Sequence, residues 1–320
     1  MKKIKTTTRN IKVKKIVSKG THCQDTVWSW AIYVYWFIIL FFIAATFYII
    51  GRGHEFLSPT NRNVVVSEEV LKQSQDYIDA AKEKIVAGDM EAAIVDLNAA
   101  IDANASASVY TLRGEAYMQM GDYQKALSDF DSALEVDGMN AVAFYDRALL
   151  NMRLENYEAA LTDVNNALAA QSMKPMDVLS MRDLYAKRGQ LNLWMKNWQG
   201  AVADYTNSLA RAEGSVSADV YAERAEAYTA LGLYENAIND YTSAVRVISE
   251  QIQAMPTQEG RESESSNAMS YFEKSAALNL KLGRNDLAKN DLESAFAIAT
   301  ALSDTESMER IQNLINGLNN

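Results

Sequence analysis

The sequence predicts an all-α protein in which a row of helical repeats follows one apolar helix near the N-terminus. Three observations lead to this prediction. A pattern of glycine, alanine and aromatic residues recurs along residues 67–302, residues 26–51 carry no charge, and all three prolines fall between predicted helices. Because proline disrupts a helix interior, Pro59, Pro175 and Pro256 mark connections in an otherwise helical chain.

A basic tail and an apolar segment open the chain. Residues 1–25 carry eight Lys and Arg against Asp25, a net charge of +7, so a chain of formal charge −10 has −17 on the remainder. As a helix, Val27–Ile50 would span about 36 Å at about 1.5 Å per residue, enough for the ~30 Å hydrocarbon core of a membrane. Aromatic residues gather near both ends of this segment, where amphipathic rings prefer the interface. We therefore expect a cytoplasmic tail over 1–25 and a transmembrane helix over 26–51.

The charge distribution also predicts topology. Basic residues before the apolar segment hold the N-terminus in the cytoplasm and send the C-terminal body across the membrane. In a bacterium this places the protein in the inner membrane with its body in the periplasm. A cleaved signal peptide is the alternative, but its apolar region would usually be shorter, about 7–15 residues. Residues 52–66 then read as a polar linker.

Six similar units follow the linker. They start near Ser74, Ala107, Ala141, Arg182, Ala218 and Met269. Their predicted turns lie at Gly88, Gly121, Glu155, Lys196, Gly232 and Gly283. Each second helix has a small residue early, at Ala93, Ala126, Ala160, Ala201, Ala237 and Ala288, and another later, at Ala100, Ala133, Ala167, Ser208, Ala244 and Ala295.

These residues resemble the tetratricopeptide repeat (TPR), a helix–turn–helix unit of 34 residues. The resemblance implies an α-solenoid of about six repeats over residues 67–302, stacked through small residues that let helices approach closely. Between units five and six, Pro256–Asn267 reads as a polar, mobile loop. Residues 303–320 are predicted to form a C-terminal capping helix, opened by a capping box over Ser303–Glu306.

Composition argues against most nucleophilic and metal-dependent enzymes. The chain has one cysteine, Cys23, and two histidines, His22 and His54, so we expect no catalytic residue, no metal site and no cofactor. An acidic body repels nucleic acid, so no nucleic-acid partner is expected. An enzyme that hydrolyses envelope polymers with two carboxylates is kept as a remote alternative.

Charged residues recur with the repeat. An Asp stands at the same place in all six units and an Arg in four, at Arg113, Arg147, Arg188 and Arg224. Because the Arg lies eight residues before the turn and the Asp eight after it, the two come level in an antiparallel hairpin. We interpret them as structural ion pairs; a ladder of charges that binds a ligand is the alternative.

TPR arrays generally bind a peptide or helix of a partner along their first helices, so the resemblance implies a similar groove here. Its predicted residues, in units two to four, are Thr111, Leu112, Glu115, Met118, Tyr145, Asp146, Leu149, Met152, Lys187, Gln190 and Trp194. Methionine and aromatic side chains at these positions suit a partly apolar segment. The alternative is that several of them pack on neighbouring repeats.

These observations together predict a membrane-anchored interaction scaffold. In plan it is similar to bacterial inner-membrane proteins with periplasmic TPR domains, which serve in envelope protein assembly or secretion. An organelle receptor whose cytosolic repeats grip precursor proteins is the alternative.

Overall fold

The computed structural model describes residues 67–174, 179–211 and 217–318. Within these ranges the chain forms thirteen α-helices and no strand. The helices are α2 (Glu68–Ala87), α3 (Met90–Ala103), α4 (Ala107–Met120), α5 (Tyr123–Val136), α6 (Ala141–Arg153), α7 (Tyr157–Met173), α8 (Met181–Trp194), α9 (Trp198–Leu209), α10 (Ala218–Ala230), α11 (Tyr234–Ile252), α12 (Gln258–Lys281), α13 (Asn285–Leu302) and α14 (Thr305–Leu318).

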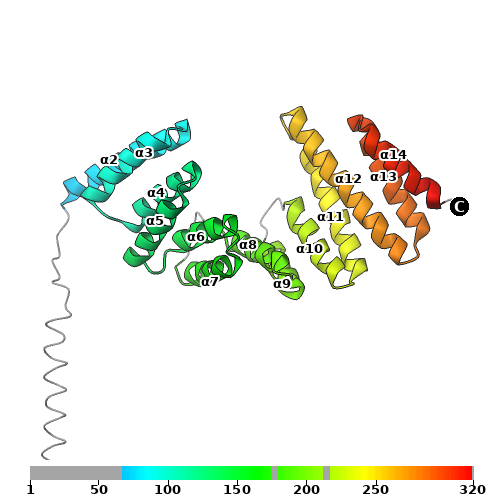
Figure 1. Cartoon of the computed structure of the whole chain (residues 1–320), viewed down its shortest axis with the longest axis horizontal. Helices are drawn as coiled ribbons and strands as arrows, with labels where there is room; N and C mark the ends of the chain where they lie inside the picture. The colour runs from blue at the N-terminus through cyan, green and yellow to red at the C-terminus, as the bar shows by residue number, and fades with distance from the viewer. Residues whose placement is uncertain (1–66, 175–178, 212–216, 319–320) are drawn as a thin grey trace, which may run out of the picture. The chain divides into compact units, whose positions relative to one another are not determined.

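The helices pack as successive hairpins (Figure 1). The hairpins α2–α3, α4–α5, α6–α7, α8–α9, α10–α11 and α12–α13 correspond to the six predicted units, and each packs on the next. First helices also meet directly, α4 against α6 and α8 against α10. This arrangement is the all-α solenoid that the repeat pattern predicted.

All six predicted turn positions adopt the left-handed backbone conformation that ends a helix. Gly88, Gly121, Gly232 and Gly283 have φ between 72° and 83°, and in each case the turn has space where a Cβ would stand. Glu155 and Lys196 adopt φ of 58° and 59° at the same place in units three and four, although side chains disfavour that region. The predicted register is therefore confirmed, including at the two units that lack a turn glycine.

The predicted small residues form the contacts between helices. All twelve are buried, and eleven of them have no exposed surface. The rings of Phe130 and Tyr205 are fully buried against Gly114 and Gly189, where an added Cβ would lie only 2.6 and 2.8 Å from the ring. Small residues thus set the distance between helices, and aromatic rings fill the space that remains.

The prediction of a loop over Pro256–Asn267 is wrong beyond its first residues. Helix α12 begins at Gln258, where the Thr257 side chain caps it by accepting a hydrogen bond from Gly260 N at 3.2 Å. Helix α11 also runs on to Ile252, and its buried residues Val247 and Ile248 belong to the same apolar cluster as residues of α12. The polar sequence thus forms the first turns of a helix that packs on α11 from Ala268 onward.

Helix α14 closes the array on α13. Ile311 and Ile315 are buried in the same cluster as Ala295 and Ala299 of α13, while Leu314 stays exposed. The cap of α14 differs from the prediction. Asp304 accepts the hydrogen bond from Ser307 N at 3.1 Å, whereas Ser303 adopts φ of 58° and ends α13.

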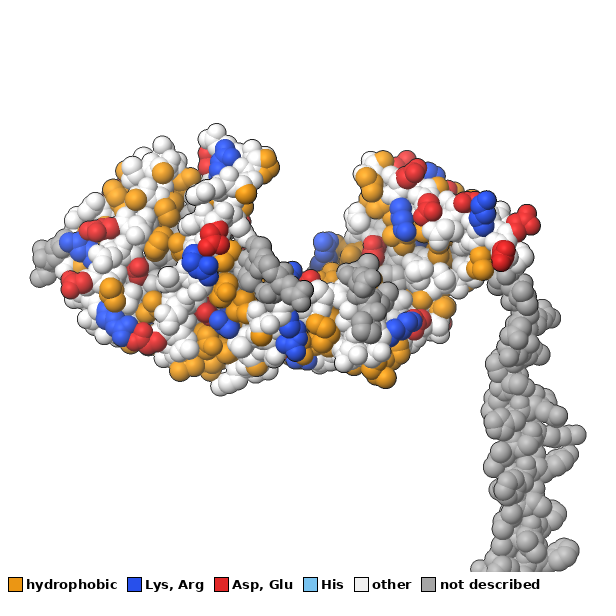
Figure 2. All heavy atoms as spheres, turned by 180° about the vertical axis from the view of Figure 1, so that it is seen from behind, with side chains coloured by type: hydrophobic (Ala, Val, Ile, Leu, Met, Phe, Trp, Pro, Cys, Tyr) orange, Lys and Arg blue, Asp and Glu red, His pale blue; other side chains and the backbone are white. Residues whose placement is uncertain are grey.

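The predicted transmembrane segment, 26–51, lies outside the described residues, as do the tail and the linker. None of the helices α2–α14 is long and apolar enough to cross a membrane. The face drawn in Figure 2 carries Lys, Arg, Asp and Glu side chains interspersed with apolar ones.

Candidate functional site

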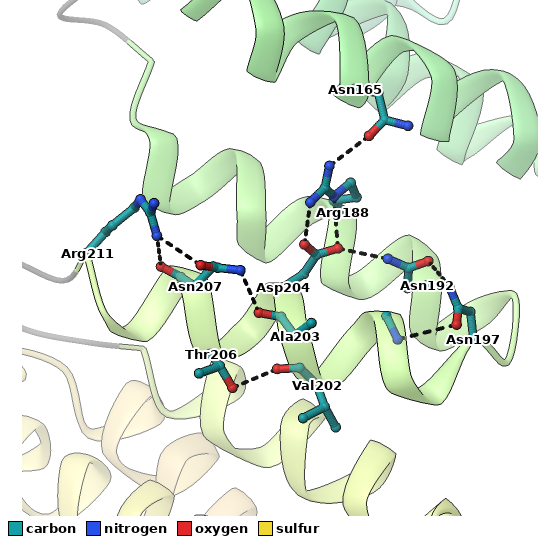
Figure 3. Close-up of polar contacts among 11 residues, drawn as sticks. Asn165, Arg188, Asn192, Asn197, Val202, Ala203, Asp204, Thr206, Asn207 and Arg211 are labelled. Carbon is teal, nitrogen blue, oxygen red and sulfur yellow. Dashed lines mark hydrogen bonds and ion pairs between the residues drawn. The ribbon is translucent and has the colours of Figure 1, made fainter. Parts of the chain in front are cut away.

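The recurring Arg and Asp form bidentate ion pairs inside four hairpins. In the α8–α9 hairpin, Arg188 Nε and Nη2 donate to the two oxygens of Asp204 at 2.9 and 2.6 Å (Figure 3). The same pair of bonds joins Arg113 to Asp129, Arg147 to Asp163 and Arg224 to Asp240. The four Asp side chains are nearly fully buried, so each pairing satisfies a carboxylate that water does not reach.

The third guanidinium nitrogen links each pair to the preceding hairpin. Arg188 Nη1 donates to Asn165 Oδ1 on α7 at 2.8 Å, and Arg147 Nη1 donates to Asp131 on α5 at 2.6 Å. Arg113 and Arg224 reach Asn98 and Thr206 in the same way. The Arg–Asp pairs therefore fix the register of the two helices within each hairpin, and they also connect each hairpin to the one before it.

The two terminal units replace the arginine by other donors. Lys84 donates to Asp96 at 2.5 Å, while Ser275 and Asn279 donate to Asp291 at 2.7 and 2.9 Å. Every one of the six recurring Asp is thus satisfied within its own hairpin. The structural interpretation of the Arg–Asp pairs is confirmed by this geometry.

A separate surface, which we call the first-helix face, is formed by α4, α6 and α8 with the adjoining sides of α2 and α10. It holds three neighbouring pockets. A pocket of about 340 Å³ lies between α2, α4 and α6, one of about 280 Å³ between α4, α6 and α8, and one of about 360 Å³ between α6, α8 and α10.

Ten of the eleven predicted groove residues line these pockets. Thr111, Leu112 and Glu115 line the first, Met118, Leu149, Met152 and Trp194 the second, Tyr145 the third, and Lys187 and Gln190 both of the last two. Asp146 lines none, because it is buried between α4 and α6.

Some predicted residues also serve the packing. Thr111 is buried and donates to the Ala107 carbonyl at 2.9 Å, and Met152 belongs to a core cluster. Trp194 remains 44% exposed, yet its ring lies 5.4 Å from that of Tyr157 on α7, centroid to centroid. The face therefore combines fixed side chains with exposed apolar surface.

The prediction missed the contributions of α2 and α10. Ile78 and Lys82 of α2 line the first pocket, and Val220 and Glu223 of α10 line the third. The repeat positions predicted for units two to four identify Ile78, Lys82 and Glu223 when they are extended to units one and five, but not Val220.

A polar network rigidifies the third pocket. Glu223 accepts hydrogen bonds from the Tyr205 hydroxyl at 2.8 Å and from Gln190 Nε2 at 3.2 Å, and Lys187 donates to Gln190 Oε1 at 3.0 Å. Burial raises the pKa of Glu223, and the two donors act in the opposite direction. The network thus holds a half-buried carboxyl group in a fixed position.

Between α4 and α6, two acids meet with no such donors. Glu115 of α4 and Asp146 of α6 lie close enough for each carboxyl group to affect the pKa of the other. Burial raises the pKa of both, to about 8 for Asp146, and the nearby Glu115 adds to that shift. At neutral pH this pair therefore holds a proton that separate, exposed carboxyl groups would have lost.

Comparison with known proteins identifies the repeat. Residues 107–140 and 218–250 match family models described as tetratricopeptide repeat. Among curated proteins, "Tetratricopeptide repeat protein 12" of Mus musculus is 31% identical over 106 residues. That match spans 32% of this chain but only 15% of the mouse protein.

Three solved structures share the arrangement of helices. Pseudomonas aeruginosa PilF has a TM-score of 0.54 at 16% identity, covering 77% of this chain and 99% of its own. PilW, described as a widely conserved type IV pilus biogenesis factor, has a TM-score of 0.54 at 15% identity over 75% and 98%. YrrB, described as a TPR protein with an unusual peptide-binding site, has a TM-score of 0.53 at 16% identity over 68% and 97%. At these identities the likeness concerns the fold alone. The described residues form an all-α solenoid, and its second and fifth hairpins match the tetratricopeptide repeat.

Proposed function

We propose that this protein is an interaction scaffold that binds a peptide or helix of a partner protein on its first-helix face. The observation that carries the proposal is the row of three pockets across consecutive first helices, α2 to α10. Apolar side chains such as Leu149 and Trp194 there adjoin polar ones such as Lys187 and Gln190, a mixture that suits an amphipathic segment. YrrB, which has a similar fold, is described as having a peptide-binding site.

We further propose that residues 26–51 anchor the scaffold in a membrane, with residues 1–25 in the cytoplasm and the repeats on the other side. The uncharged segment and the +7 tail support this placement. In a bacterium the partner would then belong to envelope protein assembly or secretion, and the fold of the pilus biogenesis factor PilW is compatible with such a role.

A crosslinking experiment tests the binding surface. A photoreactive residue replaces Leu149 of α6, which lines the pocket between α4, α6 and α8, in the full chain expressed in cells. Glu158, exposed on the second helix α7, takes the same residue as the control. A partner captured from position 149 and not from 158 supports the proposal. Capture only from 158, or only from Glu262 on α12, would place binding elsewhere on the array.

A fusion experiment tests the topology. A reporter that is active only outside the cytoplasm is joined after Asn320, and a reporter active only inside is joined at the same point in a second fusion. Activity of the first alone agrees with the proposed placement. Activity of the second alone agrees with a cytosolic repeat domain, as in an organelle receptor.

A further inference from the structure

One contact between first helices recurs along the array. Counted from the unit starts Ala107, Ala141, Arg182, Ala218 and Met269, the ninth residue of one unit meets the sixth residue of the next. Between α8 and α10 these residues are Gln190 and Glu223, joined by a hydrogen bond of 3.2 Å. Between α10 and α12 they are Glu226 and Lys274, joined by an ion pair of 2.6 Å. Each of these contacts unites a donor with an acceptor.

The contact between α4 and α6 is different because both of its residues are acids. Glu115 takes the place of Gln190, and Asp146 takes the place of Glu223. Glutamine offers two N–H donors, whereas an ionised glutamate offers none. Without a bound proton, the carboxylate of Asp146 meets only another acceptor.

The second donor of Glu223 is also missing at Asp146. Glu223 accepts a hydrogen bond from the Tyr205 hydroxyl, and the residue at that repeat position in unit two is Phe130. The positions are structurally equivalent, because the Phe130 ring lies over Gly114 as the Tyr205 ring lies over Gly189. Asp146 therefore lacks both donors that satisfy its counterpart.

Because Asp146 is buried, the lack of hydrogen-bond donors lowers the stability of the folded protein. Asp146 is only 8% exposed, and its Oδ2 is buried with no hydrogen-bond partner. A buried acceptor in that condition costs stability because it has lost its hydration without gaining a replacement. Glu115 connects the pair to the outside, since it also lines the pocket between α2, α4 and α6.

The walls of that pocket suit the stem of a long basic side chain. Ile78, Leu112 and Val142 present apolar surface beside Glu115. Lysine and arginine bury their methylene stems along apolar surface and place their charged ends on polar groups. The pocket thus offers an apolar passage that ends at Glu115, and the unpartnered carboxyl oxygen of Asp146 is buried beyond it.

We propose that Glu115, with the buried Asp146 beside it, receives a Lys or Arg side chain of the partner segment that binds the first-helix face. The inference rests on the proposed function, because it specifies the chemistry of the same partner. An ammonium or guanidinium group supplies the N–H donors that the pair lacks, and its charge favours two ionised carboxylates. The proton that the free pair holds leaves to solvent when the cation arrives.

Proton release makes the proposed binding of a basic segment depend on pH. Because the free pair must lose a proton, the basic segment binds more tightly as pH rises toward about 8, the pKa of Asp146. The other ionisable groups facing the pair are Lys82 of α2, which lines the same pocket, Tyr145 of α6, and Asp183 of α8 beyond it. Lys82 has its own contact with Asp79 at 3.9 Å.

Peptide selection tests the proposal with a defined probe. A random twelve-residue display library is selected on the purified full chain at pH 8, and peptides whose binding is weakened by Trp194→Ala are kept as groove binders. We expect these peptides to share a Lys or Arg. Its replacement by norleucine, which keeps the stem and removes the charge, should weaken binding at least tenfold.

Two isosteric variants identify the site. Glu115→Gln reproduces the Gln190–Glu223 pairing, so norleucine replacement should then weaken binding less than threefold. Asp183→Asn removes one charge from the same face and serves as the control. It should preserve the tenfold effect.

The outcomes separate the inference from the proposed function. Groove binders without a basic residue, or binders insensitive to Glu115→Gln, overturn the inference and leave the function standing. An equal effect of Asp183→Asn also overturns it, since that result indicates attraction to overall negative charge. If selection yields no peptide that depends on Trp194, the proposed function fails, and the inference fails with it.

Discussion

Arg147 of α6 and Asp163 of α7 are joined by two hydrogen bonds of 3.0 and 2.6 Å, although sixteen residues separate them. Asp163 also accepts a hydrogen bond from Asn151 at 3.2 Å, and Arg147 reaches Asp131 of the preceding hairpin. One side chain thus links three helices, α5, α6 and α7. Because Asp163 is buried, loss of its partner leaves a charge that water cannot reach.

We therefore expect Arg147→Ala and Asp163→Ala each to lower the free energy of unfolding by ~2–3 kcal/mol, somewhat less than for a fully buried pair. The double variant should lose less than the sum of the two, as a double-mutant cycle in urea would measure. Arg246→Ala is the control, because its pair with Glu250 is exposed and should contribute ~0.5 kcal/mol or less. Additive losses at Arg147 and Asp163 would contradict direct coupling.

Glycine at the left-handed turn positions Glu155 and Lys196 should make the folded protein more stable. Both residues are exposed, and both hold φ near 60° where four other units have glycine. Glycine adopts this backbone without steric strain but loses more freedom on folding, so the net gain from Glu155→Gly should be ~0.5–1 kcal/mol. Thermal unfolding would measure it.

Glu155→Ala is the matched control for that substitution. Alanine removes the same side-chain atoms but keeps the Cβ that causes the strain, so it should bring no gain. If the alanine variant proved as stable as the glycine variant, backbone strain would not be the reason.

The sequence predicts the hairpins of this fold well, because every unit needs small residues at the same helix contacts and a turn at the same place. The register places even Glu155 and Lys196 at turns, since the alanines on either side fix where each helix lies. It could not predict the N-terminal turns of α12. Residues 258–267 carry no apolar periodicity, and the residues of α12 that pack on α11 begin at Ala268.

For the candidate site, too, the repeat pattern predicts which residues share a face, whereas burial by neighbouring helices cannot be predicted from it. Register alone identifies the residues that line the pockets, because first-helix positions recur on one face. It predicted Asp146 as a groove residue as well, whereas the structure buries that side chain between two helices. The raised pKa of Asp146 depends on its burial and on Glu115 of the preceding unit, which no pattern within its own helix reveals.

The raised pKa of Asp146 predicts how stability changes with pH. The folded protein holds this proton up to about pH 8, whereas the unfolded chain releases it near the ordinary value of 3.8. The contribution of this group is therefore most favourable below pH 4, falls as pH rises to about 8, and is constant above. Asp146→Asn removes the titration and provides an amide donor for Glu115. We expect its stability relative to wild type to rise by at least ~1 kcal/mol between pH 5 and pH 8, as urea unfolding at each pH would measure.

Glu115→Gln gives an independent check of that dependence. Its amide can donate to Asp146, so the proton is no longer needed and the change of stability with pH should flatten in the same range. A difference between wild type and Asp146→Asn that stays constant from pH 5 to pH 8 would mean that Asp146 titrates normally in the folded protein.

Two tryptophans four residues apart distinguish binding from packing. Trp194 lines the pocket between α4, α6 and α8 and is 44% exposed, whereas Trp198 begins the second helix α9 and lines none of the three pockets. Trp194→Ala removes a large rigid contact surface, so it should weaken partner binding by ~1–3 kcal/mol. Trp198→Ala should leave the affinity of the folded protein unchanged while lowering its melting temperature. Calorimetry with peptides selected on the full chain, before any sorting by dependence on Trp194, measures the first effect. Thermal unfolding followed by circular dichroism measures the second. Because the same side chain is truncated in both variants, equal losses of affinity would show that the peptide does not lie on the first-helix face. Loss of affinity from Trp198→Ala alone would instead place the peptide on the second helices of the array.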